Sequence, residues 1–110
     1  MVTLTTQSKL ILKAGATYSY RLDTRRAKSD TVAANGVTIG SGAQFTFQAV
    51  ANKKLTAGTV FTVISNTSAT PISGTFSNMA DNSTFTAGRN KFQASYEGGD
   101  GNDLTLTVVQ

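Results

Sequence analysis

The chain has 110 residues, of which 39% are hydrophobic and only 15% are charged, and its net charge is +4. This length suits one domain with a modest core, so we expect a single domain over residues 1–110. Cysteine, histidine and tryptophan are absent, which excludes disulfides, thiolate or imidazole zinc sites and histidine-based catalytic triads.

Small polar residues replace the missing charged ones. The chain contains 18 threonines, 10 serines, 10 glycines and 7 asparagines, but one proline. Threonine favours the half-exposed surface of a strand, whereas glycine and asparagine favour tight turns. The composition therefore predicts an all-β protein with many turns.

Alternation of apolar and polar residues predicts the strands in chain order. The alternating stretches, with their letters, are 9–13 (KLILK), 17–22 (TYSYRL), 44–50 (QFTFQAV), 60–64 (VFTVI), 91–96 (KFQASY) and 104–109 (LTLTVV). No stretch of 12 or more residues has a convincing helical stripe, so every predicted element is a strand.

An internal repeat relates the first part of the chain to the second. Residues 10–20 match residues 37–47 at an offset of 27, and both copies read apolar-x-apolar-x-small-Gly-Ala-x-aromatic-x-aromatic. This pattern favours a β-solenoid whose coils stack, with Tyr18 over Phe45 and Tyr20 over Phe47. A β-sandwich with similar hairpins is the alternative fold.

A family resemblance rests mainly on residues 58–109. The matching segments are Gly58–Ile64, Ile72–Asn78, Phe92–Tyr96 and Gly98–Val109, and residues 12–20 and 32–47 look like preceding coils. In these segments the chain resembles bacterial proteins with autotransporter-associated β-strand repeats, in the C-terminal part of the passenger. The resemblance implies coils of a right-handed parallel β-helix, and the last coil would be followed by the β-hairpin that the residues near the C-terminus predict. It also implies an exported or cell-surface location, and a role as a stalk, an adhesin or a matrix component.

Open strand edges suggest what such a module does. A solenoid without capping elements tends to add another copy, and a head-to-tail contact that does not close produces a filament. We expect the partner to be a copy of this chain or neighbouring repeats of a longer one. The residues expected at the two ends are Val2, Leu4, Leu10 and Leu12 in the first strands and Leu104, Leu106 and Val108 in the last.

The segment Tyr96–Leu106 (YEGGDGNDLTL) has two interpretations. Three glycines and three carboxylates within seven positions resemble half of a calcium-binding nonapeptide repeat, with Asp100 and Asp103 as weak candidate ligands. However, the motif occurs once and its apolar position is out of register. Two alternating runs joined by a Gly/Asp/Asn loop are typical of a β-hairpin, so we predict a hairpin and no required cofactor.

Basic residues gather in the first half of the chain, where Arg21, Arg25, Arg26 and Lys28 form a candidate basic patch. They come without a nucleic-acid-binding motif or an aromatic platform, so we predict no nucleic-acid partner. No apolar run reaches the roughly 18 residues that a membrane-spanning helix needs, and we predict no membrane insertion.

Catalysis has little support, whereas sugar binding remains an alternative. The acidic residues fall mostly in predicted loops, and we expect no enzyme activity. As the alternative function, an adhesin module would bind polysaccharide or a cell surface by stacking sugars on Tyr18, Tyr20 and Tyr96. Core positions are the favoured interpretation of these three rings.

Overall fold

The computed structural model describes residues 3–5, 9–25, 28–50, 53–87, 89–98 and 101–109. These residues form strands, turns and irregular segments but no helix, which confirms the predicted all-β class. In the same residues there is accordingly no helix with the length and apolar character needed to cross a bilayer.

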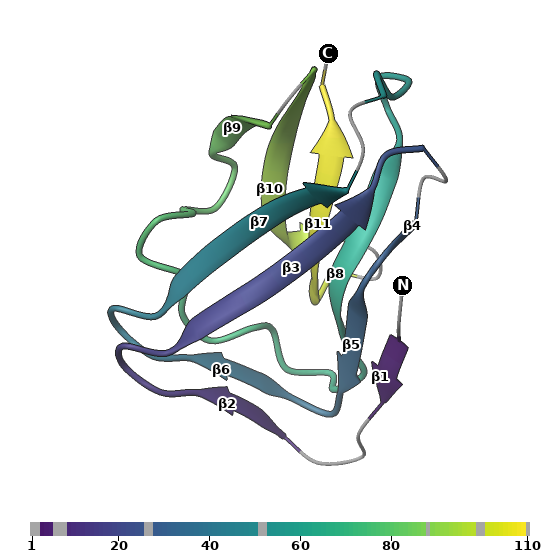
Figure 1. The fold of residues 1–110 in the computed structure, drawn as a ribbon. Coiled ribbons are helices and arrows are strands. Elements are labelled where there is room, and N and C mark those ends of the chain that lie inside the picture. Colours follow the sequence, from purple (N-terminus) through teal and green to yellow (C-terminus); the bar gives the residue numbers. More distant parts are fainter. Residues whose placement is uncertain are drawn as a thin grey trace.

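The strands belong to three sheets (Figure 1). A two-stranded sheet contains β2 (Leu10–Leu12) and β6 (Val37–Ile39), and a three-stranded sheet has the order β4 (Lys28–Ser29), β3 (Thr17–Asp23) and β7 (Gln44–Val50). The largest sheet has the order β1 (Thr3–Thr5), β5 (Thr31–Ala34), β8 (Val60–Asn66), β11 (Asp103–Val108), β10 (Asn90–Gly98) and β9 (Thr84–Ala87).

The repeat found in the sequence is a repeat of parallel strand pairs. In the β2–β6 pair Leu10 lies opposite Val37, which is the expected offset of 27. The β3–β7 pair keeps the same offset, with Tyr18 opposite Phe45 and Tyr20 opposite Phe47. Both predicted aromatic pairings are therefore confirmed.

The corner between the paired strands is also repeated. Gly15 and Gly42, again 27 positions apart, have φ angles of 81° and 89°, a region that residues with a Cβ rarely adopt. The residue after each glycine donates a backbone hydrogen bond three positions back, from Ala16 to Lys13 and from Ala43 to Gly40. Equal turns at both corners keep β3 and β7 in register along their whole length.

The six-stranded sheet changes direction halfway. β1, β5 and β8 are parallel neighbours, with Thr3 opposite Thr31 and Val32 opposite Ile64. β11, β10 and β9 then follow as antiparallel neighbours. Figure 1 shows these later strands as the yellow and green end of the chain beside β8.

An aromatic cluster joins the three-stranded sheet to the antiparallel strands. The ring centroids of Tyr20 and Phe47 lie 5.7 Å apart, and those of Phe47 and Phe92 lie 5.2 Å apart. Phe85 on β9 completes the contact, at 5.3 Å from Phe47. Such pairs contribute about 0.5–1.5 kcal/mol each beyond the burial of apolar area, so this cluster holds the two sheets together.

Candidate functional site

Six strands lie at sheet edges within the described part of the chain, and β1, β2 and β9 are three of them. The six-stranded sheet begins with β1 and ends with β9, and β2 has one partner, β6. Ile11 in the middle of β2 is 58% exposed, because strand alternation directs it away from the face of the half-buried Leu10 and Leu12. An edge strand presents unpaired backbone groups, so these edges are candidate assembly surfaces.

The first set of predicted assembly residues lies at or near these edges. Leu4 is the central residue of β1 and lies opposite Val32. Leu10 and Leu12 are half-buried on β2 and pack against the core. Val2 lies outside the described residues.

The second set lies in the interior of the sheet. Leu104, Leu106 and Val108 are at most 1% exposed on β11. β11 is paired with β8 on one side and with β10 on the other, so it lies inside the sheet. The sequence had suggested an edge strand here. The reason is the meander that places β10 and β9 beyond β11, and β9 is therefore the outer strand at this end.

The Gly/Asp segment near the C-terminus joins the two strands of a hairpin. β10 and β11 are antiparallel, with Ala94 opposite Leu106 and a register shift between Ser95 and Gly98. This pairing confirms the predicted hairpin. Of the two candidate calcium ligands, Asp100 lies outside the described residues. Asp103 accepts a hydrogen bond through Oδ1 from the Asn66 backbone N–H at 2.9 Å.

No group of three or more potential metal-ligating acids occurs among the described residues. A carboxyl pair does occur beside the hairpin, where Asp81 faces Glu97. The hydrogen bond to Asp81, partial desolvation and the charge of Asp81 raise the pKa of Glu97. Asp81 is itself positioned by the Tyr96 N–H, which donates to its Oδ1 at 3.0 Å.

The candidate basic patch is partly neutralised within the chain. Arg21 forms an ion pair with Asp30, with Nε 2.9 Å from Oδ2, and this contact raises the pKa of Arg21. Arg25 is exposed beside Asp23, whose Oδ1 accepts its backbone N–H. Lys28 is a strand residue opposite Asp23, and Arg26 lies outside the described residues.

The tyrosines belong to the core. Tyr20 and Tyr96 are buried, and Tyr18 stacks on Phe45 with an interplanar angle of 9°. The Tyr96 hydroxyl donates to the Met79 carbonyl at 2.6 Å and accepts from the Phe76 N–H at 3.1 Å. These rings are not arranged as an exposed platform for stacking sugars.

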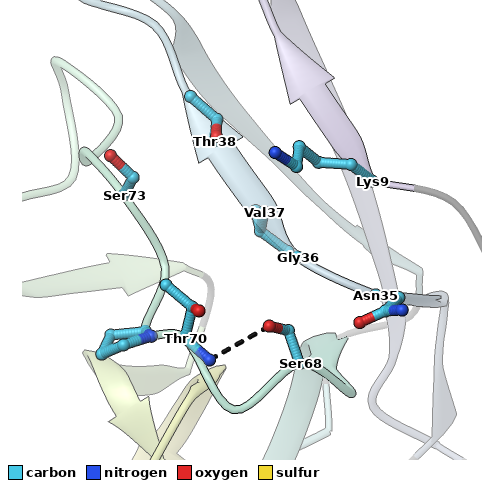
Figure 2. Close-up of a pocket in the computed structure, with 9 residues that line it drawn as sticks. Lys9, Asn35, Gly36, Val37, Thr38, Ser68, Thr70 and Ser73 are labelled. Carbon is cyan, nitrogen blue, oxygen red and sulfur yellow. Dashed lines mark hydrogen bonds between the residues drawn. The ribbon is translucent and has the colours of Figure 1, made fainter.

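A polar pocket that sequence reasoning missed lies on the β6 side of the molecule (Figure 2). It has a volume of about 220 Å³. Three chain segments that are distant in sequence line it, namely Lys9 just before β2, the β5–β6 corner with the start of β6, and the loop after β8. Its polar side chains are those of Lys9, Asn35, Thr38, Ser68, Thr70 and Ser73.

Buried Asn66 fixes one wall of this pocket. Its Oδ1 accepts hydrogen bonds from the backbone N–H groups of Gly36 and Ser68, both at 3.1 Å. Its Nδ2 donates to the Thr70 carbonyl at 2.8 Å. One side chain, 1% exposed, therefore ties the β5–β6 corner to the loop after β8.

Backbone hydrogen bonds fix the other wall. The Ser73 N–H donates to the Val37 carbonyl at 3.0 Å, and the Ile39 N–H donates to the Ser73 carbonyl at 2.7 Å. Residue 73 therefore lies along one side of β6, while β2 lies along the other. The only sequence signal of the pocket is the Ser/Thr-rich run 67–75, which reads as an ordinary loop.

Comparisons with known proteins add no relatives. No family model matches the chain, and neither the curated proteins nor the solved structures include a significant match.

Proposed function

We propose that this chain is a non-enzymatic structural module of a bacterial exported or cell-surface protein, and that it stacks end to end through open β edges. The observation that carries the proposal is the parallel pairing of β2 with β6 and β3 with β7 at one constant offset. Such pairing repeats a structural unit along one axis and leaves an edge at its end. The sequence resemblance to autotransporter-associated repeats supports the surface location.

In this proposal the parallel pairs are successive coils of a β-solenoid. β1, β2 and β3 would form one coil, and β5, β6 and β7 the next. The third coil begins with β8 and continues through Ser73, which bridges Thr38, and Ser77, which donates to the Ala43 carbonyl. The β9–β11 meander would then close this coil. It contains the predicted terminal hairpin, which is formed by β10 and β11.

The two ends of the six-stranded sheet differ, and this difference favours a polar assembly. β1 is an edge whose neighbour is parallel, and β9 is an edge whose neighbour is antiparallel. Pairing of β1 in one molecule with β9 in the next would be heterologous, so repeated addition gives a filament unless the rotation closes a ring. The first 55 residues carry eight basic and two acidic residues, and the remainder carries two basic and four acidic, which favours the same polarity.

The first experiment measures particle size against concentration by light scattering, followed by negative-stain microscopy. We expect size to grow with concentration and fibres to appear. Ile11→Lys places a charge on the edge strand β2, which belongs to the same proposed end coil as β1, and lysine at such an edge discourages the addition of a further coil. We expect this variant to stay small at concentrations at which the unmodified chain grows.

Val60→Lys is the matched control. Val60 is 56% exposed, nearly the same as Ile11, but it lies on β8, which has neighbours on both sides. We expect Val60→Lys to assemble as the unmodified chain does. A particle that stays at 11.5 kDa at every concentration would refute stacking, and equal loss of growth in both variants would refute the role of the edge.

A further inference from the structure

The pocket beside β6 has the chemistry of a site for an acidic sugar, and binding there does not require the stacking proposed above. We propose that it binds a carboxylated sugar unit of a uronic-acid polysaccharide, with Lys9 as the partner of the carboxylate. Lys9 immediately precedes β2, and Figure 2 shows its ammonium group pointing toward Thr38.

One cation and several hydroxyl groups make up the polar lining. The side chains of Thr38, Ser68, Thr70 and Ser73 bring hydroxyls, Asn35 brings an amide, and none of the described lining residues is acidic. Hydroxyls and amides both donate and accept hydrogen bonds, which matches the hydroxyls of a sugar. A lysine ammonium donates only, which matches one carboxylate oxygen.

The pocket is largely formed before a ligand arrives. Asn66 holds the Gly36 and Ser68–Thr70 wall, and the hydrogen bonds of Ser73 hold the wall along β6. The Ser68 hydroxyl is held as well, because it accepts the Thr70 N–H at 3.0 Å. A pre-organised site loses less entropy on binding, which matters for sugars because each of their hydrogen bonds replaces one with water.

The direction of the pocket favours a polymer over a free monosaccharide. The lining comes from three neighbouring segments, namely Lys9 before β2, residues 35–38 leading into β6, and the 68–73 loop. β2 lies on one side of β6 and Ser73 on the other, so the lining follows the direction in which the strands are paired. The Pro71 ring, also at the pocket, offers an apolar surface to the C–H groups of a sugar. The net charge of +4 would draw a polyanionic chain toward this surface.

The test is a titration followed by two-dimensional NMR of the backbone amides, at a protein concentration at which the chain is monomeric. The probes are a short oligogalacturonate, its fully methyl-esterified form, which keeps the hydroxyls but lacks the charge, and acetate. We expect saturable shifts for the oligogalacturonate at the amides of Gly36, Ser68, Thr70 and Ser73. We expect much weaker binding of the methyl ester and of acetate.

Variants separate the pocket from general attraction to a basic protein. Lys9→Gln should raise the dissociation constant by about tenfold or more, since it removes a charge-assisted hydrogen bond. Thr38→Val, which replaces a hydroxyl by a methyl group, should raise it about threefold. Lys13→Gln, an exposed lysine on the same segment but outside the pocket, should leave it within about twofold.

Four outcomes would overturn the proposal, and the first three concern the oligogalacturonate, its methyl ester and the lysine variants. They are no saturable shift with the oligogalacturonate, equal binding of the methyl ester, and equal weakening by Lys9→Gln and Lys13→Gln. Acetate that gives the same shifts at the same concentration would reduce the pocket to a simple anion site and would also overturn it. Circular dichroism of each variant checks that the fold is intact.

Discussion

The side chain of Asn78 pairs with the backbone of Phe45 as a neighbouring strand would. Its Nδ2 donates to the Phe45 carbonyl at 2.7 Å, and its Oδ1 accepts the Phe45 N–H at 2.8 Å. Phe45 lies on β7, and its other neighbour is Tyr18 on β3. One side-chain amide therefore provides hydrogen-bond partners for both backbone groups of Phe45. These groups lie at the outer edge of β7, the last strand of its sheet in the described part of the chain.

We expect Asn78→Ala to lower the free energy of unfolding by about 1–2 kcal/mol, because both backbone groups of Phe45 lose their partner in a partly buried position. Urea unfolding followed by circular dichroism measures the change. Asn35→Ala is the matched control, since Asn35 is exposed as Asn78 is but makes no side-chain hydrogen bond with the described residues, and it should change the stability by less than about 0.5 kcal/mol. Equal effects of the two substitutions would show that the Asn78 bonds contribute nothing specific.

The elements predicted best from sequence are those specified by local patterns. The alternation of Tyr18 and Tyr20 with polar residues, and the same pattern 27 positions later, predicted both strands and their register. Two signals agreed there, namely the period of two and the small-Gly corner. The hairpin of β10 and β11 was predicted for the same reason.

The parts that were missed depend on contacts between distant residues. Nothing local to Asn66, Asn78 or Asn90 indicates that each would bind the backbone of a segment that is remote in sequence. The interior position of β11 was also missed, since the edge or centre of a sheet is decided by which strand pairs next. The pocket depends on Lys9 meeting a loop some 60 residues later, and sequence alone does not show this meeting.

Tyr20 carries a buried hydroxyl that has no hydrogen-bond partner among the described residues. Burial raises the pKa of the Tyr20 hydroxyl, and the nearby Ser29 side chain lowers it in part. The distance or angle between the two hydroxyls does not satisfy the criteria for a hydrogen bond. We expect Tyr20→Phe to raise the free energy of unfolding by up to about 1 kcal/mol, because an unpaired buried hydroxyl is removed.

Tyr96→Phe serves as the control with the opposite sign. The Tyr96 hydroxyl makes two hydrogen bonds, to Met79 and Phe76, and its loss should lower the free energy of unfolding by about 1–3 kcal/mol. Chemical unfolding measures both variants under the same conditions. If Tyr20→Phe were as destabilising as Tyr96→Phe, the Tyr20 hydroxyl would have a partner after all.

Asp103 has a structural task that does not need calcium. Because its carboxylate accepts the Asn66 N–H, we expect Asp103→Ala to lower the free energy of unfolding by about 1.5–3 kcal/mol, with or without calcium. Asp103→Asn keeps an acceptor oxygen and should cost less. Thermal melts in chelator and in millimolar calcium should coincide for the unmodified chain. A melting temperature raised by calcium in the unmodified chain, but not in Asp103→Asn, would instead establish a calcium site.

Stacking through unlike edges predicts that two blocked variants complement each other. Thr86 lies opposite Lys91 in the β9–β10 pair, one position before the Ala87–Asn90 pair that closes the turn. In antiparallel strands the hydrogen-bonded pairs alternate, which directs the Thr86 N–H away from β10. Thr86→Pro removes this N–H at the outer edge, where proline is tolerated in a strand.

We expect Thr86→Pro alone and Ile11→Lys alone to stay monomeric. An equimolar mixture should form a dimer and nothing larger, because each variant retains the edge that the other has lost. Analytical ultracentrifugation of the separate and mixed variants measures this. A mixture that remains monomeric would rule out pairing of unlike edges.

The carboxyl pair of Asp81 and Glu97 makes stability depend on pH. Because the pKa of Glu97 is raised in the folded chain, the folded state binds its proton more tightly than the unfolded state does. The resulting stabilisation is present below the unfolded pKa of Glu97, and it is lost as the pH rises through the folded value. The hydrogen bond to Asp81, desolvation and repulsion by the charge of Asp81 all disfavour the charged form of Glu97.

We expect Glu97→Gln to raise the melting temperature at pH 7, because the amide removes the repulsion and can donate to Asp81. The difference from the unmodified chain should shrink as the pH falls and the Glu97 carboxyl takes up its proton. Thermal melts from pH 3.5 to pH 8, at roughly 20 mM ionic strength to limit screening, measure the difference. A constant difference across the range would show that the two carboxyl groups do not share a proton.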